Sequence, residues 1–266
     1  MHNRHQDKEL YFKEQVYTTE NYVIPFIERH MSIGADSEVM EVGCGEGGNM
    51  KPFLDKGCNV TGVDISPSKI DHAQQFLGSA GYGSRLSLVA DDIYNLESRF
   101  AGKYDLIILR DVIEHIHDQE RFMGFIKAFL KPDGMIFFGF PPWYNPFGGH
   151  QQICENRILS KLPYYHILPV PLYRLLLKFG GESDAKIEAL LEIKETGISI
   201  ERFERIIRQN EYFIQGKLYY FINPNYEIKF RLKPRKQADF IRRIPYLRDY
   251  LTTSVYYIIK RNTHSF

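Results

Sequence analysis

Short apolar segments alternate with amphipathic segments from residue 37 to residue 140, and this alternation limits the fold more than any other feature of the sequence. The apolar segments are five or six residues long and rich in Val, Ile, Leu and Phe, which predicts strands. They span residues 37–42, 59–64, 86–90, 104–109 and 135–140. Parallel strands need helical crossovers, so the pattern predicts an α/β protein with a Rossmann-like, doubly wound sheet covered by helices on both faces.

A glycine-rich turn joins the first predicted strand to a helix predicted for residues 49–56. Glycines here let the backbone pass close to a ligand, and the helix start offers free N–H groups. Gly43, Gly45 and Gly48 also satisfy the spacing GxGxxG of dinucleotide sites. Glu41, two residues before the first glycine, would lie close to a pyrophosphate, so it favours a ligand that carries positive charge.

Carboxylates follow the second and third predicted strands. Asp64 ends the second strand, where its side chain could accept both hydroxyls of a ribose. The alternative is that Asp64 caps the next helix and that Asp91 and Asp92 are ordinary turn residues. Ligands of such sheets bind past the carboxyl ends of the strands, and these residues share that edge.

Taken in chain order, these segments resemble the motifs of class I S-adenosylmethionine-dependent methyltransferases, with some likeness to O-methyltransferases of the ubiquinone-biosynthesis type. The matching segments read EVGCGEG, GVDIS, VADDIYNL, YDLIILRDVIEHI and LKPDGMIFF. The resemblance covers residues 36–142. It implies a seven-stranded sheet whose last strand is antiparallel, with closing strands near 212–222 and 254–260, and it implies S-adenosylmethionine as the cofactor.

The resemblance also implies which residues bind the cofactor. They are Glu41, Gly43, Cys44, Gly45, Gly47, Asp64, Ile65, Asp92, Ile93, Arg110 and Asp111. Asp64 is expected on the ribose, and Ile65 against the adenine, which Asp92 and Ile93 border. We expect the backbone N–H of Cys44 to face the cofactor.

Two histidines are candidates for the catalytic group. A hydroxyl or amine acceptor that carries a proton benefits from a base poised near neutral pH, which suits histidine. His150 follows PPWYNPFGG directly after the fifth strand, and this element is similar to an active-site segment of some small-molecule O-methyltransferases. The alternative for His150 is a hydrogen bond to a backbone carbonyl. His115, beside Glu114, is expected at the rim or in a structural role, and the spacing of Asp111, His115 and His117 matches no metal motif, so no metal is predicted.

Four regions are expected along the chain. They are an N-terminal helical cap (1–35) with a helix over 19–30, the cofactor-binding core (36–142), a helical lid inserted after the fifth strand (143–195), and a return to the core (196–266). The lid would wall an apolar substrate pocket, lie in a membrane interface, or pack on the core as a covered flap. No uncharged apolar run reaches the length of a membrane span.

Charge and cysteine content limit the partners and the compartment. The formal net charge is +1, which disfavours nucleic acid as a partner. Within residues 229–248, however, eight basic residues stand against one acid, Asp239. A solvated connector and a peripheral membrane contact both fit this segment. Three cysteines without CxxC spacing, together with a polar N-terminus, predict a reducing, cytoplasmic location.

The sequence therefore predicts an S-adenosylmethionine-dependent methyltransferase that acts on a small-molecule acceptor, apolar or lipid-linked, by O-methylation. A non-catalytic cofactor-binding or membrane-docking module is one alternative. A nicotinamide-dependent dehydrogenase is the other, and Glu41 argues against it. The acceptor and the oligomeric state do not follow from the sequence.

Overall fold

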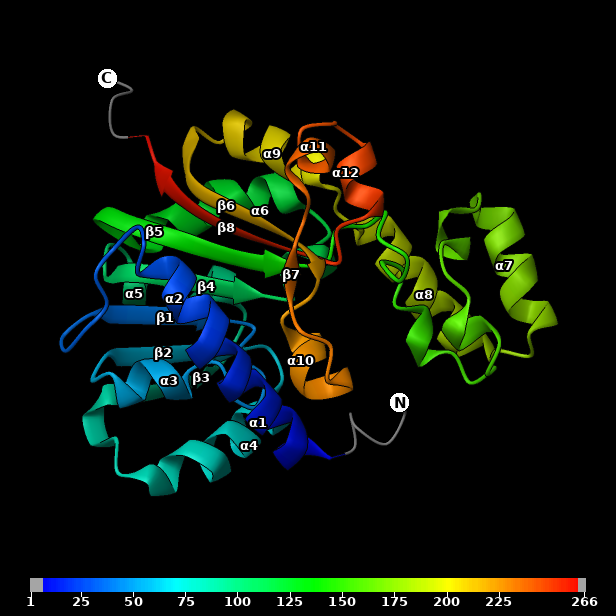
Figure 1. The fold of residues 1–266 in the computed structure, drawn as a ribbon. Coiled ribbons are helices and arrows are strands. Elements are labelled where there is room, and N and C mark those ends of the chain that lie inside the picture. The colour runs from blue at the N-terminus through cyan, green and yellow to red at the C-terminus, as the bar shows by residue number, and fades with distance from the viewer. Residues whose placement is uncertain (1–6, 263–266) are drawn as a thin grey trace.

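The computed structural model describes residues 7–262, and its centre is a mixed sheet (Figure 1). The strands of the described chain are β1 (Glu38–Val42), β2 (Asn59–Asp64), β3 (Leu86–Ala90), β4 (Tyr104–Arg110), β5 (Leu130–Phe140), β6 (Tyr212–Ile222), β7 (Arg235–Lys236) and β8 (Ser254–Arg261). Their order across the sheet is β3-β2-β1-β4-β5-β8-β6-β7. Strands β1 to β5 pair in parallel, and β8 is antiparallel to both β5 and β6. This confirms the predicted Rossmann-like sheet with an antiparallel last strand, and β7 adds an eighth, two-residue strand that was not predicted.

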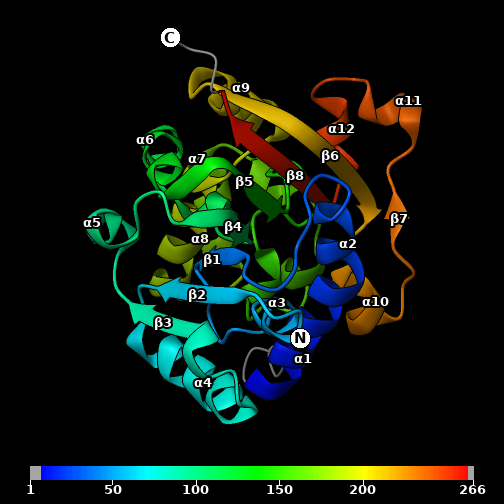
Figure 2. The same ribbon diagram turned by 90° about the vertical axis from the view of Figure 1, so that its left-hand side faces the viewer.

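Helices flank the sheet on both faces. The helices of the described chain are α1 (Lys8–Thr18), α2 (Ile24–Ile27), α3 (Lys51–Asp55), α4 (Pro67–Leu77), α5 (Glu97–Phe100), α6 (Gln119–Ile126), α7 (Val170–Phe179), α8 (Asp184–Thr196), α9 (Ile200–Gln209), α10 (Asn225–Phe230), α11 (Asp239–Arg242) and α12 (Leu247–Tyr250). One apolar cluster joins the sheet to α6 and α9, and a second joins the opposite face to α1, α2, α3 and α4. Figure 2 shows α5 and α6 on one side of the sheet and α1 and α2 on the other.

The N-terminal helix differs from the expected helix over 19–30. It begins at Lys8, and its α-helical turns are interrupted by a π-helical turn over Thr19–Val23. Pro25 follows, and proline has no N–H for the hydrogen bond of a regular α-helix and clashes with the carbonyl four residues before it. A widened turn before the proline accommodates this loss, and such turns are frequent at functional sites.

The amphipathic pattern of residues 121–130 predicts a helix, but the helix found there is displaced toward the N-terminus. Helix α6 ends at Ile126, a 3-10 turn follows, and Leu130 already pairs with Tyr104 as the first residue of β5. The sequence KPDG at residues 131–134 is typical of a turn, but these residues lie within β5, where the register between β4 and β5 shifts.

The segment after β5 forms a helical lobe built from 3-10 turns, α7 and α8. It has an apolar cluster of its own, made chiefly of Leu159, Tyr173, Leu177, Ile187 and Leu190. Figure 1 shows this lobe on the side toward which β4 and β5 point. Its role as a lid stays a prediction. Among residues 7–262, no helix is both long and apolar enough to cross a membrane.

Candidate active site

The glycine turn lies at the carboxyl end of β1, and its backbone opens toward a cavity. Gly43 and Gly45 have φ of 70° and 53°, a left-handed conformation that glycine adopts without strain. At Gly43 a Cβ atom would meet Val112 Cγ2 at 2.6 Å, so a side chain does not fit there. At Gly45 no atom of the described chain lies within 4 Å of the Cβ position, so open space faces this residue. Gly47 instead faces Leu77 of α4, which makes it a packing position.

Glu41 is buried beneath this turn with one oxygen unpaired. Its Oε1 accepts a hydrogen bond of 2.7 Å from Asn49 Nδ2, whereas its Oε2 has no partner within residues 7–262. Burial raises the pKa of Glu41 to about 8, even though Asn49 and Arg110 act in the opposite direction. A buried carboxyl with a spare acceptor is a group that a cationic ligand would stabilise.

Asp64 occupies the carboxyl end of β2, as predicted from its place in the strand. Its two oxygens accept hydrogen bonds of 2.9 Å from the N–H groups of Gly45 and Ser66. A carboxylate oxygen can accept more than one hydrogen bond, so capacity remains for hydroxyl donors. The next residue, Ile65, leaves 74% of its surface exposed, as an apolar platform for a ring would.

Three of the residues predicted to bind the cofactor make contacts within the protein. The N–H of Cys44 donates to the carbonyl of Val63 at 3.1 Å, because the turn folds back along β2, and is therefore not directed at the cavity. Asp92 caps a 3-10 turn by accepting from the N–H of Tyr94 at 3.0 Å. The apolar side chain of Ile93 is buried in the cluster that joins the sheet to α6 and α9.

Arg110, at the end of β4, connects the glycine turn to two other parts of the chain. Its guanidinium donates to Asn49 Oδ1 at 2.6 Å and to Thr19 Oγ1 at 3.1 Å. It also donates to Asn225 Oδ1 of α10. Since Asn49 holds Glu41, this buried network fixes the N-terminal helix and α10 beside the glycine turn.

A cavity of about 230 Å³ lies between α1 and the strand ends. It is lined by Lys8, Tyr11, Gln15, Gly43, Gly45, Glu46, Lys69, Arg110 and Asp111. Asp111 has φ of 55°, which is a strained backbone conformation for a residue with a side chain. Such strained residues are concentrated at functional sites. Burial, and then the charge of Asp111, raise the pKa of Tyr11.

Sequence reasoning missed the α1 residues of this cavity. Lys8, Tyr11 and Gln15 recur at spacings of three and four, so they share one face of α1. This polar face was the available signal, but apolar periodicity does not report it.

His115 and His150 come together near the same edge. Their ring centroids lie 5.2 Å apart at an angle of 76°. His150 has φ of 54° and is half-buried. Desolvation lowers the pKa of His115 even though the nearby Asp111 favours its charged form, so this imidazole is more neutral than usual.

Glu114 completes this group. It is buried, neither carboxyl oxygen has a hydrogen-bond partner in the described part of the chain, and burial raises its pKa well above the usual range. One ligand atom from each of Glu114, His115 and His150 lies within 4.8 Å of the others. The absence of a bound metal therefore stays a prediction.

Comparisons with known proteins agree with this geometry. Residues 16–145 match a family model described as a methyltransferase domain. The chain is 33% identical to the ubiquinone biosynthesis O-methyltransferase of Actinobacillus pleuropneumoniae serotype 7 (strain AP76) over 103 residues. This aligned segment covers 38% of this chain and 44% of the relative. The matched segment spans less than half the length of this and the next curated relative.

Solved structures of low sequence identity share the fold. Phosphoethanolamine N-methyltransferase 2 of Haemonchus contortus, in complex with S-adenosyl-L-methionine, is 15% identical with a TM-score of 0.59, over 96% of this chain and 57% of that one. Geranyl diphosphate C-methyltransferase of Streptomyces coelicolor A3(2) is also 15% identical, with a TM-score of 0.56 over 90% of this chain and 76% of that one.

Proposed function

Since this chain carries a class I, S-adenosylmethionine-dependent methyltransferase domain, we propose that the protein methylates a hydroxyl group of an apolar or lipid-linked small molecule. The observation that carries the proposal is the set of carboxyl groups around the open glycine turn. Glu41, Asp64 and Asp111 lie at the ends of three neighbouring strands, at the edge where sheets of this kind bind ligands.

The residues of this edge suit the parts of S-adenosylmethionine. Glu41 Oε2 and Asp111 offer negative charge to the ammonium and sulfonium groups, and Asp64 offers acceptors to the ribose. Lys8, Lys69 and Arg110 line the same cavity and could pair with the carboxylate of the ligand. Open space at Gly45 allows close approach of the ligand to the backbone.

In this proposal the histidine pair handles the proton of the acceptor. S-adenosylmethionine supplies an electrophilic methyl group, so the protein has to align the acceptor hydroxyl and remove its proton. We assign the base to His150, with His115 beside it as a neutral imidazole. The name of the curated relatives supports an oxygen nucleophile, and the geranyl diphosphate enzyme is named for an acceptor with an apolar, prenyl chain.

Calorimetric titration with S-adenosylmethionine and S-adenosylhomocysteine tests the proposed site. We expect both ligands to bind, and Asp64→Ala to weaken binding at least tenfold while the far-UV spectrum is unchanged, because a charged hydrogen-bond acceptor is lost. Glu97→Ala, at a helix start outside the cavity, is the control. If neither ligand bound the native protein, the proposal would be wrong.

A second experiment addresses the reaction. Protein and radiolabelled methyl donor are incubated with hydroxylated aromatic compounds that carry or lack a prenyl chain, and label is counted in the organic extract. Ligand binding without transfer to any acceptor would favour a non-catalytic module. Thermal stabilisation by NAD, but not by S-adenosylhomocysteine, would favour a dehydrogenase.

A further inference from the structure

Helix α7 is apolar on two opposite faces, and only one of them is covered. Tyr173 and Leu177 face the lobe core and are fully buried. Leu172, Leu175 and Phe179 recur at spacings of three and four on the other side, with exposed fractions of 52%, 50% and 83%. An apolar face of a helix is normally buried against another part of the protein. We call the exposed row the outer stripe of α7.

The lobe that carries the outer stripe has exposed cations without ion-pair partners among residues 7–262. Lys178 lies within α7, and Arg157 and Lys161 lie in the turns before it; all three are exposed. In the part of the chain that the structure describes, no carboxylate lies within ion-pair distance of these three side chains. Their long stems allow the charged ends to reach past an apolar surface.

The basic segment after β6 also combines exposed cations with exposed apolar side chains. We call residues 229–247 the connector. Apart from Lys229 it carries six exposed cations, which are Arg231, Lys233, Arg235, Lys236, Arg242 and Arg243. Its exposed apolar side chains are Phe230, Leu232, Phe240, Ile244, Tyr246 and Leu247. Asp239 is its one carboxylate, and it pairs with Arg242 at 3.0 Å.

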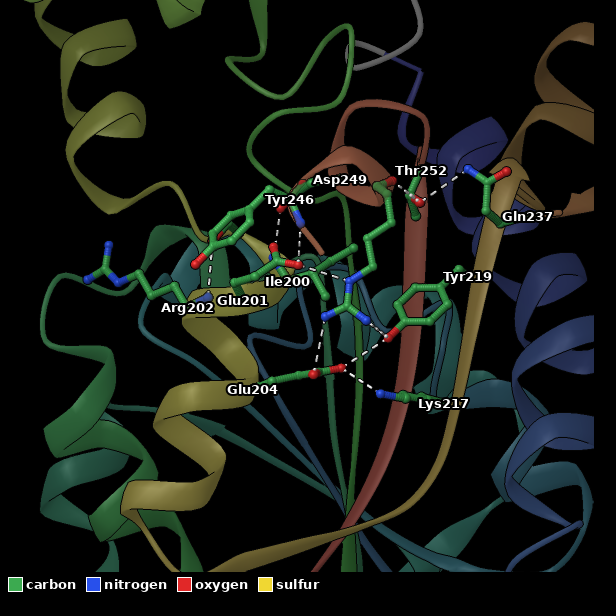
Figure 3. A network of polar contacts seen from close by, with 12 residues as sticks. Ile200, Glu201, Arg202, Glu204, Lys217, Tyr219, Gln237, Tyr246, Asp249 and Thr252 are labelled. Carbon is green, nitrogen blue, oxygen red and sulfur yellow. Dashed lines mark hydrogen bonds and ion pairs between the residues drawn. The ribbon is translucent and has the colours of Figure 1, made fainter. Parts of the chain in front are cut away.

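The last basic residue of the predicted basic segment does not belong to this surface. Arg248 is only 9% exposed, and its partners Glu201, Glu204 and Tyr219 are labelled in the polar network of Figure 3. It donates to Glu201 Oε1 at 2.9 Å and to Glu204 Oε2 at 3.2 Å. Gln237 donates to the carbonyl of Leu251, which joins the two ends of the α11–α12 region, and the N–H of Gln237 donates to the carbonyl of Tyr219 on β6 at 2.8 Å. The network therefore presents the connector on a fixed support.

Tyr250, at the end of α12 and three residues after the connector, contacts the lobe. Its ring stacks on Tyr144 with centroids 5.3 Å apart, and its carbonyl accepts a hydrogen bond of 3.0 Å from the hydroxyl of Tyr164. Two exposed surfaces with the same composition, apolar side chains between exposed cations, are thus joined through this tyrosine.

We propose that the outer stripe of α7 and the connector together dock the protein on an anionic lipid bilayer. Exposed Leu and Phe gain free energy by entering the acyl boundary, and Lys and Arg around them pair with anionic headgroups. The excess of cations over carboxylates on the connector favours a negatively charged surface as the partner. Docking would bring the carboxyl edge of the sheet to the place where an apolar acceptor dissolves.

Co-sedimentation with vesicles tests this surface without any methyl transfer, so its result is independent of the proposed reaction. The full chain is mixed with phosphatidylcholine vesicles that contain or lack 30% phosphatidylglycerol. We expect binding to the anionic vesicles and loss of binding in high salt, because salt screens charges separated from the surface by more than a few ångströms.

Matched variants separate the two contributions. Phe179→Ser is expected to lower the partition coefficient at least tenfold, while Phe213→Ser, an exposed phenylalanine on β6, leaves it unchanged. Arg235→Gln with Arg243→Gln is expected to lower it about fivefold per cation, while Arg205→Gln with Arg208→Gln on α9 does not.

Two outcomes would overturn the proposal. One is equal sedimentation of the native protein with neutral and anionic vesicles, or with none. The other is a dimer, seen by light scattering without lipid, that Phe179→Ser dissociates; this would assign the outer stripe to a second copy of the chain.

Discussion

Glu41 connects cofactor binding to pH. Burial raises its pKa to about 8, so the carboxyl is mostly protonated at pH 7. A ligand with positive charge beside it favours the ionised form, and binding should then release a proton below pH 8. We expect affinity for S-adenosylmethionine to rise with pH, by at most tenfold per unit, and to level off above about pH 8.

Calorimetry in two buffers of different ionisation enthalpy measures the released proton directly. Glu41→Gln keeps the size of the side chain and removes its charge, so we expect the difference between the buffers to fall and the pH dependence to flatten. Any protons that the ligand itself releases are released on binding to this variant as well, so the difference between the two proteins reports Glu41 alone. Identical proton release by the native protein and the variant would rule out the role given to Glu41.

His150 is expected to affect turnover more than binding. A positioned general base contributes roughly 10²- to 10⁴-fold, so His150→Gln should lower kcat by that order and leave the Kd of S-adenosylmethionine nearly unchanged. The conservative variant retains a hydrogen-bonding group, and a kcat close to native would indicate the structural alternative.

The same assay tests the metal prediction. A ring nitrogen bound to a metal has no lone pair left to accept a proton, so the proposed base and a metal ligand exclude one another at that atom. We therefore expect dialysis against a chelator to leave kcat unchanged. Loss of activity that a divalent cation restores would assign an ion to Glu114, His115 and His150.

At the scale of elements, the sequence predicted the strands whose local run of apolar residues matches their position in the sheet. Strands β2 and β3 have the predicted ends, because each is a short apolar run in the parallel part of the sheet. The carboxylates of the site were predictable for the same reason, since parallel topology places strand ends on one edge.

Elements held by contacts distant in sequence could not be predicted in this way. Helices α1 and α10 are largely polar, and they meet where Tyr17 and Tyr22 of the N-terminal region both donate to Glu227 of α10. More than 200 residues separate these partners, so no local periodicity reports them. Tyr11 reaches the cavity on the same helix and was missed together with it.

The position of α12 should depend on the side chain of Arg248. Burial opposes ionisation of Glu204, but hydrogen bonds from Lys217 and Tyr257 and the charge of Arg248 outweigh it and lower its pKa to about 2. Arg248→Met would leave Glu201 and Glu204 short of their shared partner. Breaking a buried ion pair costs about 3–5 kcal/mol, and we expect a loss near the lower end of this range in urea unfolding because Arg248 is partly accessible.

Arg242→Met is the matched control for this variant. Arg242 pairs with the exposed Asp239 on the same short helix, so its replacement should change the free energy of unfolding by less than about 0.5 kcal/mol. Equal effects of the two variants would show that the network at Arg248 does not support α12.

For the whole molecule, buried acids should make stability fall as pH rises from about 4.5 toward 8. Burial raises the pKa of Glu41 to about 8, that of Asp249 to about 7, and that of Glu114 well above its usual range. Between the unfolded and folded pKa values the folded protein holds protons that the unfolded chain releases. Stability therefore decreases with pH in this window, by up to about 1.4 kcal/mol per unit for each such group.

A buried histidine opposes this trend below its usual pKa. Burial lowers the pKa of His166 to about 4, so below about pH 6.5 the unfolded chain binds the extra proton and the contribution of this group to stability rises with pH. Because three carboxyl groups oppose this imidazole, stability still falls with pH below about pH 6.5, only less steeply, and Tm should decline further toward pH 8.5. Thermal unfolding across this range should show the decline in the native protein and a shallower one in Glu41→Gln. Saturating S-adenosylmethionine should oppose it as well, because its charge stabilises the ionised Glu41; a Tm that rises from pH 6.5 to 8.5 would contradict the protonated state of these buried carboxyl groups.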